Sequence, residues 1–225
     1  MYVIAEIGSN WDGSLKLAID HIDACVSAGV DAVKFQLWRT NIVYPNNPEN
    51  KKWELDFATA EEIYEYARNV HGITCFFTPS YPEAVDFCEE IKVPMYKIAS
   101  VTSAMKHEYS LETMHKVAAT GKPVIISYGY GDKTGDIFND NLTIDMQCVA
   151  KYPAKSSEYS NYGHLSDHTL GTSLMFDFIS YDPDIVIEKH VKLMDNSSPD
   201  SPFSLYTQEL ADFITLSKSS LFKLG

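Results

Sequence analysis

The sequence predicts a compact (β/α)8 barrel, the TIM-barrel architecture of the α/β class. Short apolar runs alternate with segments of helical periodicity along the chain of 225 residues, and eight such runs occur. Repeated alternation of strand and helix implies a parallel sheet, and eight units favour a closed barrel over an open doubly wound sheet. No linker or low-complexity tract divides the chain, so residues 1–225 are expected to form a single domain.

The predicted strands are short, apolar and mostly bounded by Gly, Pro or polar residues. The first, "YVIAEIG", ends at a glycine, and the second, "AVKFQLW", leads into a polar loop at residues 39–50. The seventh is the weakest, because polar residues interrupt it. In chain order the strands are expected at residues 2–8, 32–38, 74–79, 95–100, 123–129, 142–150, 163–168 and 185–191.

The predicted helices place apolar residues on one face. In the first, Leu15, Ala18 and Ile22 recur at helical spacing, and Gly29 is suited to end the helix. After the fifth and sixth strands the sequence is too polar or lacks a helical period, so degenerate helices are expected there. The six convincing helices are expected at residues 14–29, 58–72, 81–92, 110–121, 169–182 and 207–222.

Composition restricts the class of protein. Hydrophobic residues make up 45% of the chain and charged residues 22%, which is enough to form a sizeable core. The formal net charge of −13 argues against a broad nucleic-acid face or an anionic membrane surface. No apolar run approaches the roughly 20 residues of a spanning helix, and no basic stretch precedes the first apolar run.

The cysteines form no CxxC pair and are predicted to be reduced, mostly buried thiols of a cytoplasmic protein. They are Cys25, Cys75, Cys88 and Cys148.

Two lysines interrupt apolar strands. Lys34 lies within "AVKFQ" and Lys97 within "MYKIAS". A buried lysine is costly unless it is paired, and catalytic groups of this fold lie at the carboxyl ends of the strands. One interpretation is an anion between the lysines; the other is that each lysine pairs with a strand-end acid such as Glu6 or Glu188. Together with nearby hydroxyls the lysines form a plausible phosphate and carboxylate cradle, whose residues are Lys34, Thr78, Lys97, Ser100, Ser127 and Ser166.

Two histidines end neighbouring predicted strands. His168 follows the seventh strand and His190 ends the eighth, so their rings are able to converge on one divalent ion such as Mn²⁺. Asp200 is placed to approach from the following loop. The alternative is that these are ordinary structural histidines. The histidines predicted to lie on the surface are His21, His71, His107 and His115.

At these residues the chain resembles the sialic acid synthase family, which includes N-acetylneuraminate, pseudaminate and legionaminate synthases. The matching segments run nearly end to end and keep their order and spacing. They are "AEIGSNWDGS", "AGVDAVKFQ", "FFTPS", "YKIAS", "GKPVIISYG", "CVAKYPA", "LSDHTLG" and "IEKHVKL". The segment "DSPFSL" is most similar to the pseudaminate branch.

The resemblance implies condensation of phosphoenolpyruvate with an open-chain N-acetyl amino sugar, giving a nonulosonic acid and phosphate. It implies that the cradle residues above bind phosphoenolpyruvate and that His168 and His190 bind Mn²⁺ or Mg²⁺. It also implies that Glu6 is catalytic and that Gln36 and Tyr152 contact the sugar. Asp200 is predicted to bind the substrate as well. A homodimer is expected from family precedent, as is a catalytic barrel without the family's C-terminal antifreeze-like domain.

Three positions depart from the family pattern. Trp11 replaces the usual His, Thr102 replaces an acid, and Ala150 replaces an Asn of the neuraminate branch. These departures concern the sugar side, so the acceptor stays unspecified. Two alternatives remain open: a phosphoenolpyruvate-dependent synthase acting on a different aldose, and a catalytically idle ligand-binding barrel.

Overall fold

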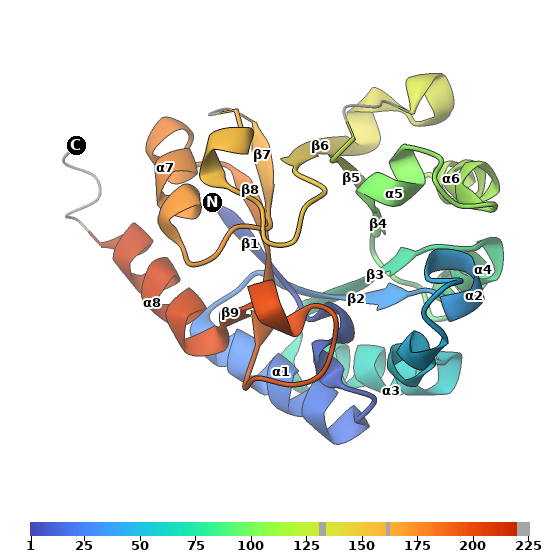
Figure 1. The fold of residues 1–225 in the computed structure, drawn as a ribbon, viewed down its shortest axis with the longest axis horizontal. Helices are drawn as coiled ribbons and strands as arrows, with labels where there is room; N and C mark the ends of the chain where they lie inside the picture. The colour runs from blue at the N-terminus through green and yellow to red at the C-terminus, as the bar shows by residue number, and fades with distance from the viewer. Residues whose placement is uncertain (131–133, 161–162, 220–225) are drawn as a thin grey trace.

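Eight parallel strands close into a barrel in the computed structural model, which describes residues 1–130, 134–160 and 163–219 (Figure 1). Each strand pairs with the next in chain order, and β1 also pairs with β8, which closes the sheet. The predicted strands are confirmed; they are β1 Tyr2–Glu6, β2 Ala32–Leu37, β3 Thr74–Pro79, β4 Tyr96–Ile98, β5 Val124–Tyr128, β6 Thr143–Cys148, β7 His164–Asp167 and β8 Val186–Lys192. A two-residue strand, β9 (Leu205–Tyr206), adds to the end of β8.

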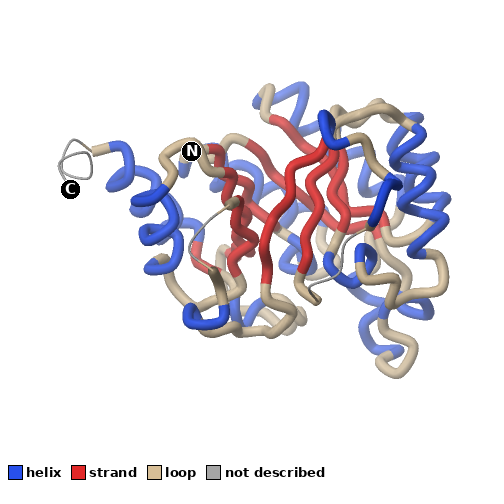
Figure 2. The backbone as a smooth tube through the Cα atoms, turned by 90° about the horizontal axis from the view of Figure 1, so that it is seen from above, coloured by secondary structure: helices blue, strands red, loops and turns tan. Residues whose placement is uncertain are grey.

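The helices surround the strands on the outside of the barrel (Figure 2). All six predicted helices are present: α1 Leu15–Ala28, α3 Phe57–Tyr66, α4 Pro82–Glu90, α6 Ser110–Ala119, α7 Ser173–Tyr181 and α8 Thr207–Lys218. A π-helical turn, Ala67–His71, extends α3. The end of the helix predicted to reach residue 222 lies partly outside the described residues. Two short helices were not predicted, α2 (Thr40–Val43) and α5 (Ser100–Ser103).

The connections after β5 and β6 contain only short 3-10 turns in their described residues. These are Gly135–Ile137 and Asp140–Leu142 after β5, and Ser156–Glu158 after β6. The prediction of degenerate helices at these two places is therefore confirmed.

Local sequence explains how α1 begins and ends. The Ser14 side chain accepts a hydrogen bond from the Leu17 backbone N–H at 3.3 Å, which satisfies one of the free donors of the first turn. Gly29 ends the helix with φ of 83°, a left-handed conformation that glycine adopts without steric cost.

His21 also belongs to the buried face of α1, so its prediction as a surface residue is wrong. The ring packs fully buried, with Nδ1 2.7 Å from the Leu17 carbonyl oxygen. Its Nε2 accepts a hydrogen bond from the Leu193 backbone N–H, which ties the helix to the segment after β8.

Two hydrophobic layers support the barrel. The larger lies between the strands and the helices. A smaller one fills the barrel interior, and its buried members are Ile4, Ala32, Phe76, Ile125, Met146 and Val186. Side chains two positions apart on a strand point to the same face. The residues two positions further on, toward the carboxyl ends, therefore also point inward; they are Glu6, Lys34, Thr78, Ser127, Cys148 and Glu188.

A buried ion pair joins β7 and β8. Its residues occupy strand positions that alternate with the inward-pointing positions. Lys189 Nζ lies 2.8 Å from Asp167 Oδ2, and both side chains are fully buried. The same ammonium group donates to the Thr169 carbonyl oxygen at 2.6 Å. Neither Lys189 nor Asp167 lines a cavity at the carboxyl ends of the strands.

The four cysteines are free and buried, as predicted. None of the described helices is long and apolar enough to cross a membrane.

Candidate active site

A cavity opens at the carboxyl ends of the strands. It contains every predicted cradle residue, together with Gln36, Tyr152 and both predicted metal ligands. The described residues that line it are Lys34, Gln36, Thr78, Lys97, Ala99, Ser100, Ser127, Cys148, Tyr152, Ser166, His168, Glu188 and His190. We call this the inner cavity. Of the predicted site residues, only Glu6 and Asp200 do not line it.

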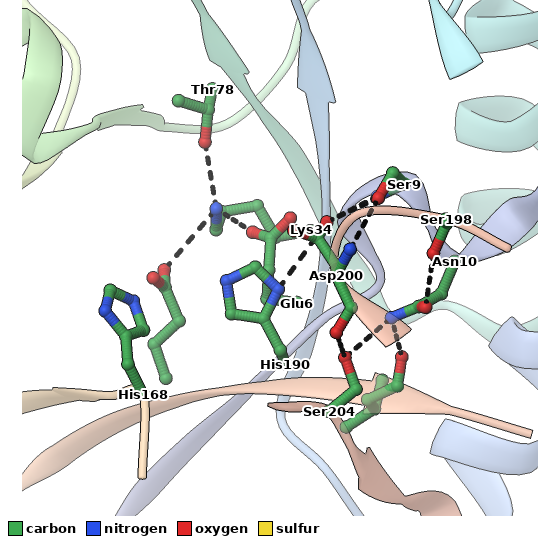
Figure 3. A network of polar contacts seen from close by, with 12 residues as sticks. Glu6, Ser9, Asn10, Lys34, Thr78, His168, His190, Ser198, Asp200 and Ser204 are labelled. Atoms are coloured by element: carbon green, nitrogen blue, oxygen red, sulfur yellow. Dashed lines mark hydrogen bonds and ion pairs between the residues drawn. The ribbon is translucent and has the colours of Figure 1, made fainter. Parts of the chain in front are cut away.

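The two lysines are each paired with carboxylates. Lys34 Nζ forms an ion pair with Glu6, lies 3.6 Å from Glu188 Oε2, and donates to Thr78 Oγ1 at 2.9 Å (Figure 3). Lys97 Nζ lies 3.0 Å from each oxygen of the Glu188 carboxylate. The alternative that each lysine pairs with a strand-end acid is therefore what the structure shows, and both lysines line the cavity as well.

Burial and charge act on these groups in opposite directions. Burial lowers the pKa of Lys34 to about 8, and the nearby Glu188 carboxylate opposes that shift. Burial by itself raises the pKa of Glu188, but Lys34 and Lys97 outweigh it and hold that pKa well below its ordinary value. Glu188 is therefore a carboxylate at neutral pH, shared between two cations.

Glu6 lies fully buried beside Lys34. Its Oε2 forms the ion pair with Lys34, and its Oε1 has no hydrogen-bond partner in the described part of the chain. An ionised carboxylate with unused acceptor capacity is able to accept a proton from a bound water or to stabilise positive charge.

The two site histidines converge at the mouth. The ring centroids of His168 and His190 are 5.6 Å apart. His168 Nδ1 lies 2.7 Å from the Val149 carbonyl oxygen, which only accepts, so Nδ1 carries the proton and Nε2 presents its lone pair. Burial, with the neighbouring His190, lowers the pKa of His168 to about 3, so the ring is neutral.

Asp200 approaches His190 but is held by the loop after β1. Its Oδ2 lies 3.7 Å from His190 Nδ1 and accepts hydrogen bonds from the Ser9 backbone N–H and the Ser9 hydroxyl, each at 2.8 Å (Figure 3). Asn10 stabilises the same loop, because its side-chain amide donates a hydrogen bond to Ser204 Oγ at 2.8 Å. Residues 196–204 are thereby fixed against the first turn of chain after β1.

Gly8 makes this approach possible, and Gly8→Ala is expected to destabilise the protein. Gly8 has φ of 54°, and an added Cβ would lie 2.3 Å from Asp200 Oδ2 and 3.1 Å from Glu6 Oε1. The left-handed conformation costs about 1–2 kcal/mol for a residue with a Cβ, and the displacement of Asp200 adds to that cost. Urea unfolding measures the loss.

Gly72→Ala is the matched control for this prediction. Gly72 has φ of 64°, and no atom of the described residues lies within 4 Å of its added Cβ. We expect Gly72→Ala to show the conformational cost alone, and Gly8→Ala to lose clearly more. Equal losses in the two variants would contradict a steric role for Gly8.

A second, wider chamber adjoins the inner cavity, and six residues line both: Gln36, Thr78, Ala99, Ser100, Tyr152 and His190. We call it the outer chamber. Asp200 lines it, and its aromatic side chains are Trp38, Tyr44, Tyr152 and Phe203.

Several lining residues were not predicted. His107, expected on the surface, lines the outer chamber, and its Nε2 is buried without a partner in the described structure. Cys148 lines the inner cavity. Glu188 also lines it; the sequence indicated it as a possible partner of the lysines but not as a site residue, although it is charged, lies inside an apolar strand and comes two positions before His190.

A closed barrel with charged and hydroxyl side chains gathered at its C-terminal mouth has the arrangement of a TIM-barrel enzyme. Within that class the chain belongs to the NeuB family, whose model matches residues 21–223. It is 30% identical to an uncharacterized protein of Methanocaldococcus jannaschii over 95% of this chain and 68% of that protein.

Two named relatives are similar over nearly the whole chain. A pseudaminic acid synthase of Helicobacter pylori is 26% identical over 99% of this chain and 75% of the relative. The crystal structure of an N-acetylneuraminic acid synthetase from Leptospira borgpetersenii superposes with a TM-score of 0.86 at 26% identity. That match covers 99% of this chain and 84% of the other.

Proposed function

We propose that this protein condenses phosphoenolpyruvate with an open-chain N-acetyl amino sugar, forming a nonulosonic acid and releasing phosphate. One observation supports this most directly: a small cavity lined by two lysines and four serine and threonine hydroxyls adjoins a larger chamber lined by aromatic residues. The two spaces suit a small anion and an uncharged sugar. The names of the relatives as pseudaminic and neuraminic acid synthases support the same reaction.

The inner cavity is the proposed phosphoenolpyruvate site. Lysine ammonium groups provide charge, and hydroxyls provide directed donors for the phosphate and carboxylate oxygens. The residues proposed to bind it are Lys34, Thr78, Lys97, Ser100, Ser127 and Ser166.

His168 and His190 fit a divalent ion, Mn²⁺ or Mg²⁺. The fit rests on the neutral ring of His168, whose Nδ1 proton is fixed by the Val149 carbonyl, and on the buried Nδ1 of His190, which has no hydrogen-bond partner among the described residues. Groups of three or more potential ligand side chains are lacking among the described residues, so water or substrate would complete the shell. A bound ion would act as a Lewis acid toward the sugar aldehyde.

The protein's own groups account for the remaining steps. The enol C3 of phosphoenolpyruvate attacks the aldehyde carbon, and cationic character develops at C2. Water adds at C2, where Glu6 is proposed to accept the proton that this water loses or to stabilise the positive charge, and the oxygen of the former aldehyde takes up a proton. The tetrahedral adduct then expels phosphate, whose charge Lys34 and Lys97 stabilise. Gln36, Tyr152 and Asp200 are proposed to orient the acceptor from the outer chamber.

Release of inorganic phosphate from phosphoenolpyruvate, measured with a panel of aldoses, tests the proposal. We expect release with an N-acetyl amino sugar such as N-acetylmannosamine or a 2,4-diacetamido hexose. Release only with arabinose 5-phosphate or erythrose 4-phosphate would favour a synthase for another aldose. If no aldose supports release and phosphoenolpyruvate does not bind, the barrel is catalytically idle.

A further inference from the structure

Glu188 lies at the centre of the inner cavity's charged groups. It is 4% exposed and belongs to β8, two positions after Val186 of the apolar interior cluster. Lys97 Nζ lies 3.0 Å from both of its oxygens, and Lys34 Nζ lies 3.6 Å from Oε2. The Ser166 hydroxyl donates to Oε1 at 3.0 Å. One carboxylate therefore contacts both lysines and one of the proposed hydroxyl ligands.

The two lysines depend on Glu188 to different degrees. Lys34 has a second carboxylate, Glu6, and also donates to Thr78. For Lys97, Glu188 is the sole acidic partner within hydrogen-bond distance in the described residues. The other contact of Lys97 Nζ is Met146 Sδ at 3.6 Å, a weak acceptor in the apolar interior.

Without a carboxylate between them, two buried ammonium groups repel each other, and at least one of them leaves its place or loses its proton. With Glu188 present, both ammonium groups are held side by side above the apolar interior. An anion that enters from the mouth therefore binds to groups that are already in position. Such prior placement reduces the ordering cost of binding.

We propose that Glu188 is a positioning residue for phosphoenolpyruvate, holding the ammonium groups of Lys34 and Lys97 at the spacing that receives the substrate's anionic groups. This inference rests on the function proposed above. Glu188 acts chiefly through Lys97, because Lys34 keeps Glu6 and Thr78 as partners when Glu188 is lost.

Calorimetric titration of phosphoenolpyruvate into Glu188→Gln, with Mn²⁺ present, tests the inference. The side chain keeps its shape and loses its charge. We expect the dissociation constant to rise at least about tenfold, while the Michaelis constant for the acceptor sugar stays within about threefold of the wild type. Circular dichroism establishes the folded fraction. If Glu188→Gln does not fold, Glu188→Asp takes its place, since it keeps the charge and withdraws the carboxylate; a severalfold weakening is expected.

Asp167→Asn is the matched control. It breaks a buried lysine–carboxylate pair between the same two strands, away from both cavities. A residue whose role is only to stabilise the fold would lower the melting temperature without changing the phosphoenolpyruvate dissociation constant. We expect that result for Asp167→Asn and not for Glu188→Gln.

A double-mutant cycle with Lys97→Met identifies the group through which Glu188 acts. In the Lys97→Met background, we expect Glu188→Gln not to raise the dissociation constant further; the loss of a carboxylate that has lost its closest cation lowers the constant or leaves it unchanged. Additive losses, or wild-type affinity in both Glu188→Gln and Glu188→Asp, would overturn the inference and leave the proposed function intact. No phosphoenolpyruvate binding to the wild type would overturn both.

Discussion

Lys97→Met and Lys34→Met are each expected to weaken phosphoenolpyruvate binding by about ten- to a hundredfold or more. A charge-assisted contact to an anion in a sheltered site contributes roughly 1.5–3 kcal/mol, and each 1.4 kcal/mol is about a factor of ten in affinity. Methionine keeps the apolar stem of lysine and removes the ammonium group, so the effect measures charge rather than packing.

The carboxylates in the cavity increase this loss. When Lys97 is removed, Lys34 is the one ion-pair partner that Glu188 keeps among the described residues, and the excess negative charge of Glu188 opposes binding of the anion. When Lys34 is removed, the buried Glu6 loses its ion-pair partner. The losses are therefore expected in the upper part of the range for both variants.

Calorimetric titration of phosphoenolpyruvate into the wild type and each variant measures the effect. Lys192→Met is the control, because Lys192 is also a buried lysine of the barrel but pairs with Asp195 and lines neither cavity. The Lys192→Met variant is expected to bind phosphoenolpyruvate with the affinity of the wild type. If Lys34→Met and Lys97→Met bind as tightly as the control, the cradle has been assigned to the wrong residues.

The fold was predictable because its strands are apolar, regularly spaced and separated by amphipathic helices. The short helices α2 and α5 were missed because four residues do not complete enough turns to show a 3.6-residue period. His21 was an avoidable error. It lies three residues after Ala18 and four before Cys25, so the same periodicity that predicted the helix places it on the buried face.

The site was predictable in outline, since polar residues at the carboxyl ends of parallel strands meet at one mouth. Which acid pairs with which lysine was not predictable, because it depends on register and on side-chain reach across the barrel. Lys97 of β4 pairs with Glu188 of β8, 91 positions later. His107 follows a short helix in a loop, where no period indicates which way a side chain faces.

His168→Ala is expected to lower turnover at least about a hundredfold while leaving the fold intact. His168 is proposed as one of two side chains that bind the divalent ion, and even residues that only orient a ligand typically contribute about ten- to a hundredfold to metal affinity or activity. The side chain lies at the cavity mouth against Tyr152, so its removal enlarges a space that is already open to solvent.

Metal content after dialysis, Mn²⁺ titration and phosphate release together measure this effect, and circular dichroism reports on the fold. His164→Ala is the matched control, because His164 begins the same strand, at the opposite end from the mouth. It is expected to retain both the metal and turnover. Wild-type metal affinity in His168→Ala would remove His168 from the ligand set. Full activity of the wild type after chelation and dialysis would exclude the metal from the reaction altogether, and the polarisation of the aldehyde would then have to come from the protein's own donors at the mouth.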